Sequence, residues 1–328
     1  MIYDFALEPE LVASWGNLQD YRYFAQAFGL GQPRIMAEYP KLKNWRRQVL
    51  QAAQGAGDLE FERVTALIGI FTECVVSRDR QYEGALGWLP NAEQEHARIP
   101  FHAILANSNP HRHPVVLTEH NLGVDQDRRW ELGRSATPNR KAGDLADSVA
   151  SMLRICNVVI FVDPHFGPEN SRHRKPLGAF LDKILARGPE CPMPKRIEMQ
   201  TSDKADEMYF RSECDKHLAI IIPQGLSLRI VRWRERDGGE KLHGRYILTD
   251  VGGVSFQIGL DEGKTGETED IDLMDRAKYL KRWSQYASNE PAFDRSGEPI
   301  EIVGIAPLSS VPGSNPYSCC RSSKSVSF

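Results

Sequence analysis

The stretch NVVIFVDPHF, residues 157–166, decides the fold that we expect for this chain. Its first six residues are predicted to form a strand, because Asn157 is followed by a continuous apolar run, rich in β-branched side chains, that is typical of a strand buried on both faces. Before this run, apolar residues recur at helical spacing over residues 145–155. After it, we expect a helix that begins near Pro176, because the first turn of a helix tolerates proline. A buried strand between two helices indicates an α/β unit.

Strands and helices continue to alternate beyond this unit. The pattern predicts a strand over residues 196–200, a helix capped by Ser202 or Asp203 that ends near Ile221, and a strand over residues 226–233. We therefore expect an α/β protein with a mixed, largely parallel sheet flanked by helices. Such sheets usually bind ligands at the carboxyl ends of their strands.

Two polar residues follow the buried strand at such an end. Asp163 and His165 come directly after Val162, so we predict them as substrate-binding residues. The alternative is a structural role, since Asp-Pro is a common start of a turn.

Two further strands are expected near the carboxyl end of this region. They span residues 243–249 and 254–258, and the glycines between them suit a tight hairpin across residues 250–253. Apolar spacing over residues 273–283 predicts a final amphipathic helix, and residues 300–305 are expected to add an edge strand.

The pattern divides the chain into three regions. Residues 1–140 are predicted to be mostly helical, with the clearest helices over residues 45–53 and 59–75, and their role is undetermined. Residues 141–308 are the expected α/β domain. Residues 309–328 are rich in Ser, Pro and Gly, so we expect a disordered tail.

The composition favours a soluble, folded protein without a strong global charge. Lys and Arg number 41 and Asp and Glu 44, and this net charge of -3 supplies no general field toward nucleic acid or lipid. No apolar run approaches the ~20 residues that span a bilayer, and the acidic amino terminus does not resemble a signal peptide. We therefore expect a cytoplasmic location. The six cysteines show no zinc-type spacing, and we expect reduced thiols, with Cys156 in the core, and neither metal nor cofactor.

The stretch HGRYILTD, residues 243–250, carries the chemistry that we predict. Alternation along a strand would put His243 and Arg245 on the same face, where both could reach one ligand. Imidazole can attack a phosphodiester, and a guanidinium can hold phosphate oxygens through paired hydrogen bonds. Asp250 could then orient the imidazole. These three residues are the predicted catalytic site.

This H-x-R-x4-D pattern resembles the H-x-K-x4-D motif of the phospholipase D superfamily, with Arg in the Lys position. The Asp-Pro pair at residues 163–164 and the later Gly259-Leu260-Asp261 add to the resemblance, which covers about residues 145–283. The layout is similar to the single phospholipase D-like module of certain microtubule-interacting-and-trafficking proteins, although Gly244 replaces an Asp of that module. It also resembles bacterial phospholipase D-like proteins, some of which belong to phage-defence systems. Asp261 is accordingly predicted to bind substrate.

Phosphoryl transfer through histidine normally needs two imidazoles, and only one clean motif is present. His173-Arg174-Lys175 has the first spacing but lacks the Asp, so we interpret it as a solvated loop. A homodimer that joins two His243 rings would give a metal-independent phosphodiesterase or nuclease. The alternative is a non-catalytic subunit that binds a phosphate-bearing ligand, such as nucleic acid, or docks other proteins of a defence assembly.

Overall fold

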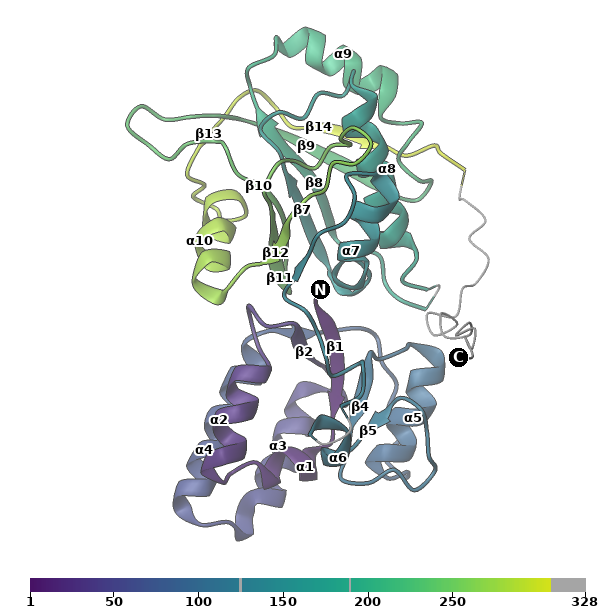
Figure 1. Cartoon of the computed structure of the whole chain (residues 1–328), viewed down its shortest axis with the longest axis vertical. Coiled ribbons are helices and arrows are strands. Elements are labelled where there is room, and N and C mark those ends of the chain that lie inside the picture. The colour runs from purple at the N-terminus through teal and green to yellow at the C-terminus, as the bar shows by residue number, and fades with distance from the viewer. Residues whose placement is uncertain (124–125, 189, 308–328) are drawn as a thin grey trace, which may run out of the picture.

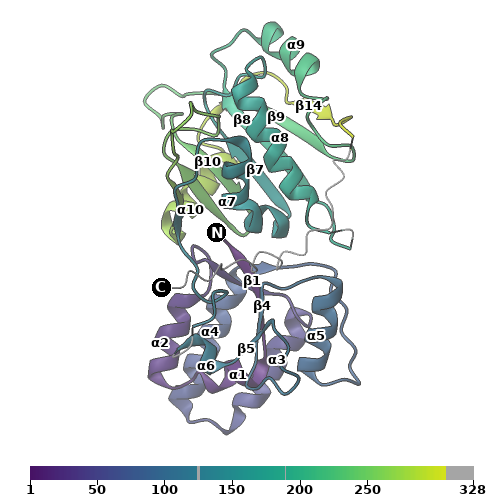
Figure 2. The same cartoon turned by 45° about the vertical axis from the view of Figure 1, so that its right-hand side comes forward.

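The protein is described here by a computed structural model, which covers residues 1–123, 126–188 and 190–307. Two α/β units are stacked along the long axis of the molecule, as Figure 1 and Figure 2 show. The first unit contains the strands from β1 to β5. The second sheet already includes β6 (Ser135–Ala136), so it recruits residues a few positions before the expected boundary at residue 140.

The first unit is rich in helix, as expected, but its helices surround a parallel sheet that the sequence analysis did not predict. The sheet has the order β3-β2-β1-β4-β5, and every pair in it is parallel. Its strands are β1 (Tyr3–Leu7), β2 (Arg34–Ala37), β3 (Val75–Val76), β4 (Ala103–Leu105) and β5 (Val116–Leu117). The helices are α1 (Pro9–Ser14), α2 (Leu18–Ala27), α3 (Leu42–Ala52), the 3-10 turn η1 (Ala53–Gly55), α4 (Asp58–Glu73), α5 (Trp88–Arg98) and α6 (Glu119–Leu122).

These strands are only two to five residues long, which is why periodicity missed most of them. The central strand β1 is held in the core of the unit, where Phe5, Ala6 and Leu7 are all fully buried. The Trp45 indole of α3 donates a hydrogen bond of 2.8 Å to the Leu7 carbonyl. Tertiary contacts of this kind stabilise strands that local propensity alone does not specify.

The second unit contains a mixed nine-stranded sheet. Its central strands β9, β8 and β7 are parallel, and antiparallel strands flank them on both sides. The path is β13-β9-β8-β7-β10-β11-β12-β6, with β14 also paired to β9. The strands are β7 (Val158–Val162), β8 (Arg196–Ser202), β9 (Ser227–Arg234), β10 (Arg245–Thr249), β11 (Gly252–Phe256), β12 (Ile271–Leu273), β13 (Asp294–Arg295) and β14 (Ile300–Val303).

Helices cover both faces of this sheet, so the expected α/β class is confirmed. They are α7 (Ala142–Ile155), α8 (Ser171–Leu185), α9 (Glu207–His217) and α10 (Arg276–Tyr286). Strand β7 is buried on both faces, as its sequence predicted. Val159 and Phe161 belong to the core beneath α7 and α8, whereas Ile160 and Val162 belong to the core beneath α10.

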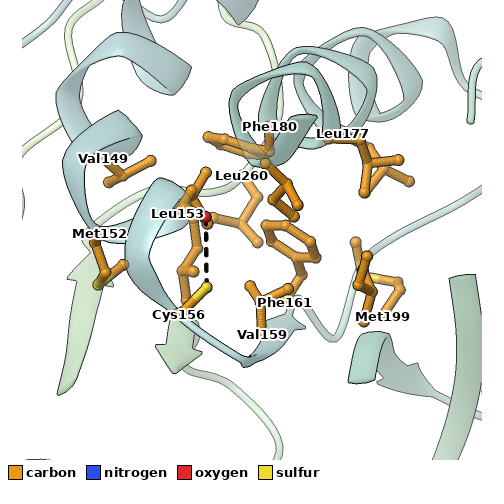
Figure 3. Packing of buried hydrophobic residues seen from close by; sticks show 14 of the residues in the cluster. Val149, Met152, Leu153, Cys156, Val159, Phe161, Leu177, Phe180, Met199 and Leu260 are labelled. Atoms are coloured by element: carbon orange, nitrogen blue, oxygen red, sulfur yellow. Dashed lines mark hydrogen bonds between the residues drawn. The ribbon is translucent and has the colours of Figure 1, made fainter. Parts of the chain in front are cut away.

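The core beneath α7 and α8 contains stacked aromatic side chains. Figure 3 shows Phe161 beside Phe180 and Leu177 of α8, and the two phenyl rings have their centroids 5.5 Å apart. Cys156 lies in the same core, where its thiol donates to the Leu153 carbonyl. Burial raises the pKa of this thiol to about 12, so Cys156 is a core residue, as expected, and not a nucleophile.

Helix α8 begins five residues earlier than expected and includes Pro176 in its interior. Proline lacks the N–H that would bond the carbonyl of Arg172, four residues before it. The N–H of Glu262 donates to that carbonyl instead, at 2.9 Å. The freed helix carbonyl therefore anchors the loop that follows Gly259-Leu260-Asp261. The expected cap of the next helix is also corrected, because Asp206 caps α9 by accepting from the Tyr209 N–H.

Contacts between the two units involve several elements. Cys74 donates to the Asp250 carbonyl at 3.6 Å, and Arg276 pairs with Glu73. Ile2 and Val76 join the hydrophobic cluster of the second unit, so one core continues across the junction. The tail expected over residues 309–328 lies outside the described residues. Within the part that is described, no helix combines the length and the apolar character that crossing a membrane requires.

Candidate functional site

The predicted site residues meet at one edge of the second sheet, with one exception. Strands β7 and β10 are neighbours and antiparallel, and Val162 pairs with Tyr246. The end of β7 therefore meets the start of β10. This edge carries Asp163 and His165 from β7 and its loop, and His243 and Arg245 from β10 and the loop before it.

Arg245 is the first residue of β10, and His243 precedes the strand. The expected strand at residues 243–249 is corrected accordingly, because His243 lies outside it. Another contact joins the two residues: the Arg245 guanidinium donates to the His243 carbonyl at 3.0 Å. His243 is exposed and Arg245 is partly exposed, so both are accessible to a ligand.

Gly244 separates these two residues for a steric reason. A Cβ atom at this position would overlap the phenol of Tyr246. Tyr246 is buried, its ring packs beside Tyr286, and the Arg282 guanidinium lies 5.2 Å from its centroid. This packing favours glycine at position 244.

Asp163 is buried and holds two loops at the edge. Its Oδ1 accepts from the His165 N–H at 2.9 Å, and its Oδ2 accepts from the Leu260 N–H at 3.3 Å. These bonds support the structural alternative for Asp163, because they engage both oxygens. The same arrangement leaves the His165 side chain exposed, next to the fixed carboxylate.

Asp261 is surrounded by two arginines and a histidine. Its carboxylate lies 2.7 Å from Arg140 Nη2 and 3.2 Å from Arg172 Nε, and His173 Nε2 is 4.0 Å away. Asp261 is itself buried, so these contacts compensate a charge removed from water. The geometry gives it a role in fixing the loop of residues 259–261, and the predicted substrate contact stays a prediction.

His173 is buried in α8, so its interpretation as part of a solvated loop is wrong. Its Nδ1 accepts from the Gly167 N–H at 3.0 Å. The ring is thereby committed to holding the loop between β7 and α8. With Asp163 and Leu260 it lines a small internal void that is too small to hold a water molecule.

Arg140 and Glu269 complete this edge, and sequence reasoning missed both. Arg140 Nη1 lies 3.2 Å from Glu267 and its Nε 3.5 Å from Glu269. Glu269 is fully buried and accepts from the N–H groups of Ile258 and Gly259. Burial raises the pKa of Glu269. Arg140 lies more than a hundred residues before Glu267 and Glu269 in the chain, so no local sequence pattern indicated that these residues interact.

Asp250 lies at the opposite end of β10, roughly 16 Å along the strand from Arg245. Its Oδ1 accepts from the N–H groups of Asn157 and Val158 at 2.8 and 3.0 Å. Its Oδ2 accepts from the Asn157 side-chain amide at 3.3 Å. The expected orienting role of Asp250 toward His243 is therefore corrected: this carboxylate fixes the start of β7.

The edge thus offers two exposed imidazoles and one partly exposed guanidinium on a rigid base. His165 and His243 lie in loops, each three residues beyond the paired Val162 and Tyr246, and the strands from which these loops extend are neighbours about 4.8 Å apart. Within residues 1–123, 126–188 and 190–307, no group of three His, Cys, Asp or Glu side chains is placed to hold a metal ion.

The comparisons with known proteins do not assign this chain to a family. No family model and no curated protein matches the chain. Among solved structures, one that is similar to part of the chain is TrmBL2, an archaeal chromatin protein described as showing a novel mode of DNA binding. The identity is 10% and the TM-score 0.24, over 53% of this chain and 58% of TrmBL2, so the chain spans less than two thirds of that protein. A likeness this weak carries no argument about fold or function.

Proposed function

We propose that this chain is a phospholipase D-like phosphodiesterase that acts without a metal ion at the edge formed by β7 and β10. The observation that carries the proposal is the antiparallel register of these strands. It brings the loops of two exposed histidines, His165 and His243, to one edge, beside Arg245. The resemblance of residues 243–250 to the superfamily motif supplies the reaction class.

In this proposal, a neutral His243 nitrogen attacks the phosphorus of the diester. A phosphorus–nitrogen bond forms, the bond to the leaving oxygen breaks, and protonated His165 donates its proton to that oxygen. Water then attacks the phosphohistidine, with His165 as the base, and His243 is released. Arg245 holds the phosphate oxygens throughout, as guanidinium groups do. Atoms and protons balance over the two steps.

The proposal differs in one respect from the homodimer expected from the sequence. A second imidazole from the same chain removes the need for two His243 rings to meet across a two-fold axis. The two versions are separable, because only the dimeric one predicts that His165 is dispensable.

The experiment measures cleavage of labelled DNA, RNA and a chromogenic phosphodiester with a metal chelator present. We expect cleavage to fall at least ~100-fold in His243→Ala and in His165→Ala, since each removes an acid–base or nucleophilic group. His111→Ala is the matched control, because it removes another exposed imidazole, in the first unit. Cleavage of equal rate in His243→Ala would overturn the proposal. Full activity of His165→Ala in a dimeric protein would favour the two-chain version.

A second function, binding without cleavage, is favoured by the corrected position of Asp250. Among the described residues, no carboxylate hydrogen-bonds to the His243 ring, although an orienting partner usually holds a catalytic histidine. In this version the site holds a phosphate-bearing ligand, such as nucleic acid, for a larger assembly. Wild-type protein would then bind a labelled oligonucleotide without cleaving it, and Arg245→Gln would weaken that binding. Cleavage that depends on His243 would exclude this version.

A further inference from the structure

A groove lies on the α10 side of the second sheet, over strands β8 and β9. It has a volume of about 360 Å³ and is lined by side chains of both strands, the end of α10 and β13. The residues that matter are Arg196, Glu198, Arg229, Trp233, Tyr286 and Arg295. This volume is within the range of roughly 300–1,000 Å³ that small-molecule sites occupy.

The groove exists because α10 covers only part of this face. The helix packs over β10 and β11, with Tyr279 in the core between them, and in its last turn the Tyr286 carbonyl accepts from the Gln200 side chain of β8 at 3.1 Å. On the same face, Ile160 pairs with Glu198, and Val162 with Gln200. The side chains therefore change from apolar beneath α10 to polar in the groove.

The floor of the groove is a buried polar network. Glu198 is fully buried, and its carboxylate lies 2.8 Å from both Nε and Nη2 of Arg196. Gln200 donates to Glu198 at 2.7 Å and accepts from the Trp233 indole at 2.9 Å. A buried carboxylate is costly unless its partners are fixed, and here they are. The network orients the Arg196 guanidinium from below.

The rim carries more positive charge than the floor neutralises. Arg229 lies 3.5 Å from Glu198 and 3.5 Å from Glu301, so two carboxylates share it at long range. The backbone of Arg295 pairs with Trp233 of β9, but its guanidinium is exposed and forms no hydrogen bond or ion pair with any side chain or carbonyl of the residues that the structure describes. Three guanidiniums thus face two carboxylates around the groove.

We infer that this groove binds a small organic oxyanion, held by Arg229 and Arg295 at the rim above Arg196. The guanidinium fork matches both phosphate and carboxylate groups, so the shared chemistry is that of the oxyanion. Val231, Trp233 and Tyr286 line the groove beside the charges and give the body of the ligand an apolar contact. The inference does not rest on the proposed function, whose residues lie at the strand edge.

The test uses two probes that separate the sources of the oxyanion: adenosine 5′-monophosphate for a phosphate and succinate for a carboxylate. Binding to the full chain is measured by calorimetry at constant ionic strength. We expect saturable binding of at least one probe. In the double variant Arg229→Gln/Arg295→Gln, the affinity for this probe should fall at least about tenfold, because the variant removes charged hydrogen-bond donors. Both arginines are surface residues, and Arg196 still neutralises Glu198, so the variant should fold.

Two controls make the result specific. Arg234→Gln removes an exposed arginine of β9 whose neighbour Trp233 faces the groove, so alternation points Arg234 away from it, and binding should be unchanged. His111→Ala removes an exposed imidazole of the first unit, outside both the groove and the proposed catalytic site, and should also bind the probe like wild type. Saturable binding of neither probe, binding by the double variant equal to wild type, or loss of binding in Arg234→Gln or His111→Ala would each overturn the inference.

Discussion

Arg140 Nη2 lies 2.7 Å from the Asp261 carboxylate, and the same guanidinium lies 3.5 Å from the fully buried Glu269. One arginine thus compensates two buried carboxylates that hold the loop of residues 259–261. Arg172 also contacts Asp261, but more than half of its side chain is exposed. Because the two arginines share a partner and differ in burial, they form a natural comparison.

We expect Arg140→Gln to destabilise the fold by about 3–5 kcal/mol, because it leaves buried carboxylates without their cation. Arg172→Gln, which removes an exposed partner of the same Asp261, should cost about 1 kcal/mol or less. Denaturant unfolding of both variants measures the difference. Equal losses in the two variants would show that the burial of Arg140 does not set its contribution.

Asp250→Ala is expected to lower stability by about 1–3 kcal/mol, because the N–H groups of Asn157 and Val158 lose their acceptor. Its effect on phosphodiester cleavage or phosphate binding, measured well below the unfolding temperature, should be small. Asp250→Asn keeps one acceptor oxygen and should retain part of the stability. A loss of activity as large as that of His243→Ala, in a folded Asp250→Ala protein, would restore the orienting role expected from the sequence.

The second unit was largely predictable because its pattern is strong. The apolar run of residues 158–162 is buried on both faces, and β10 and β11 form the expected hairpin. Its glycines are placed differently from the prediction, because Gly252 and Gly253 belong to β11 and pair with β10 instead of forming the turn. The first sheet was not predictable, since strands such as Val75–Val76 are too short to show a period. At the site, the sequence identified His243, Arg245 and Asp163 as candidates, and the pairing of β7 with β10 brings them to one edge. It could not show that Asp250 bonds to Asn157, because this pairing depends on how β7 and β10 lie side by side.

Gly244→Ala is predicted to destabilise the protein by about 1–3 kcal/mol, because the added methyl group would overlap the Tyr246 phenol. Tyr246 is buried against Tyr286, so its ring has little room to move. Combining Gly244→Ala with Tyr246→Leu should recover part of the loss relative to the two single changes, and a double-mutant cycle measures this coupling. Additive losses would show that the two residues do not compete for space.

Two histidines of the first unit, His96 and His102, should make the stability of the protein depend on pH. Burial, followed by nearby His113 and Arg80, lowers the pKa of His96 to about 4, and burial lowers the pKa of His102 to about 4. His96 Nδ1 accepts from the Phe101 N–H, and the His102 Nε2 is bonded to the Arg129 carbonyl at 3.0 Å. The first bond needs a ring nitrogen without a proton, so the folded state favours a neutral His96.

The direction in which stability changes with pH follows from proton uptake by the folded and unfolded states. Below the ordinary histidine pKa of about 6.5, the unfolded chain binds protons that the folded chain accepts only near pH 4. Stability should therefore fall as the pH drops through this window, by up to about 1.4 kcal/mol per pH unit for each histidine. His102→Gln should lessen the slope by about one proton, as measured by denaturant unfolding between about pH 7 and pH 5. A slope in His102→Gln identical to that of the wild type would show that His102 does not titrate differently in the two states.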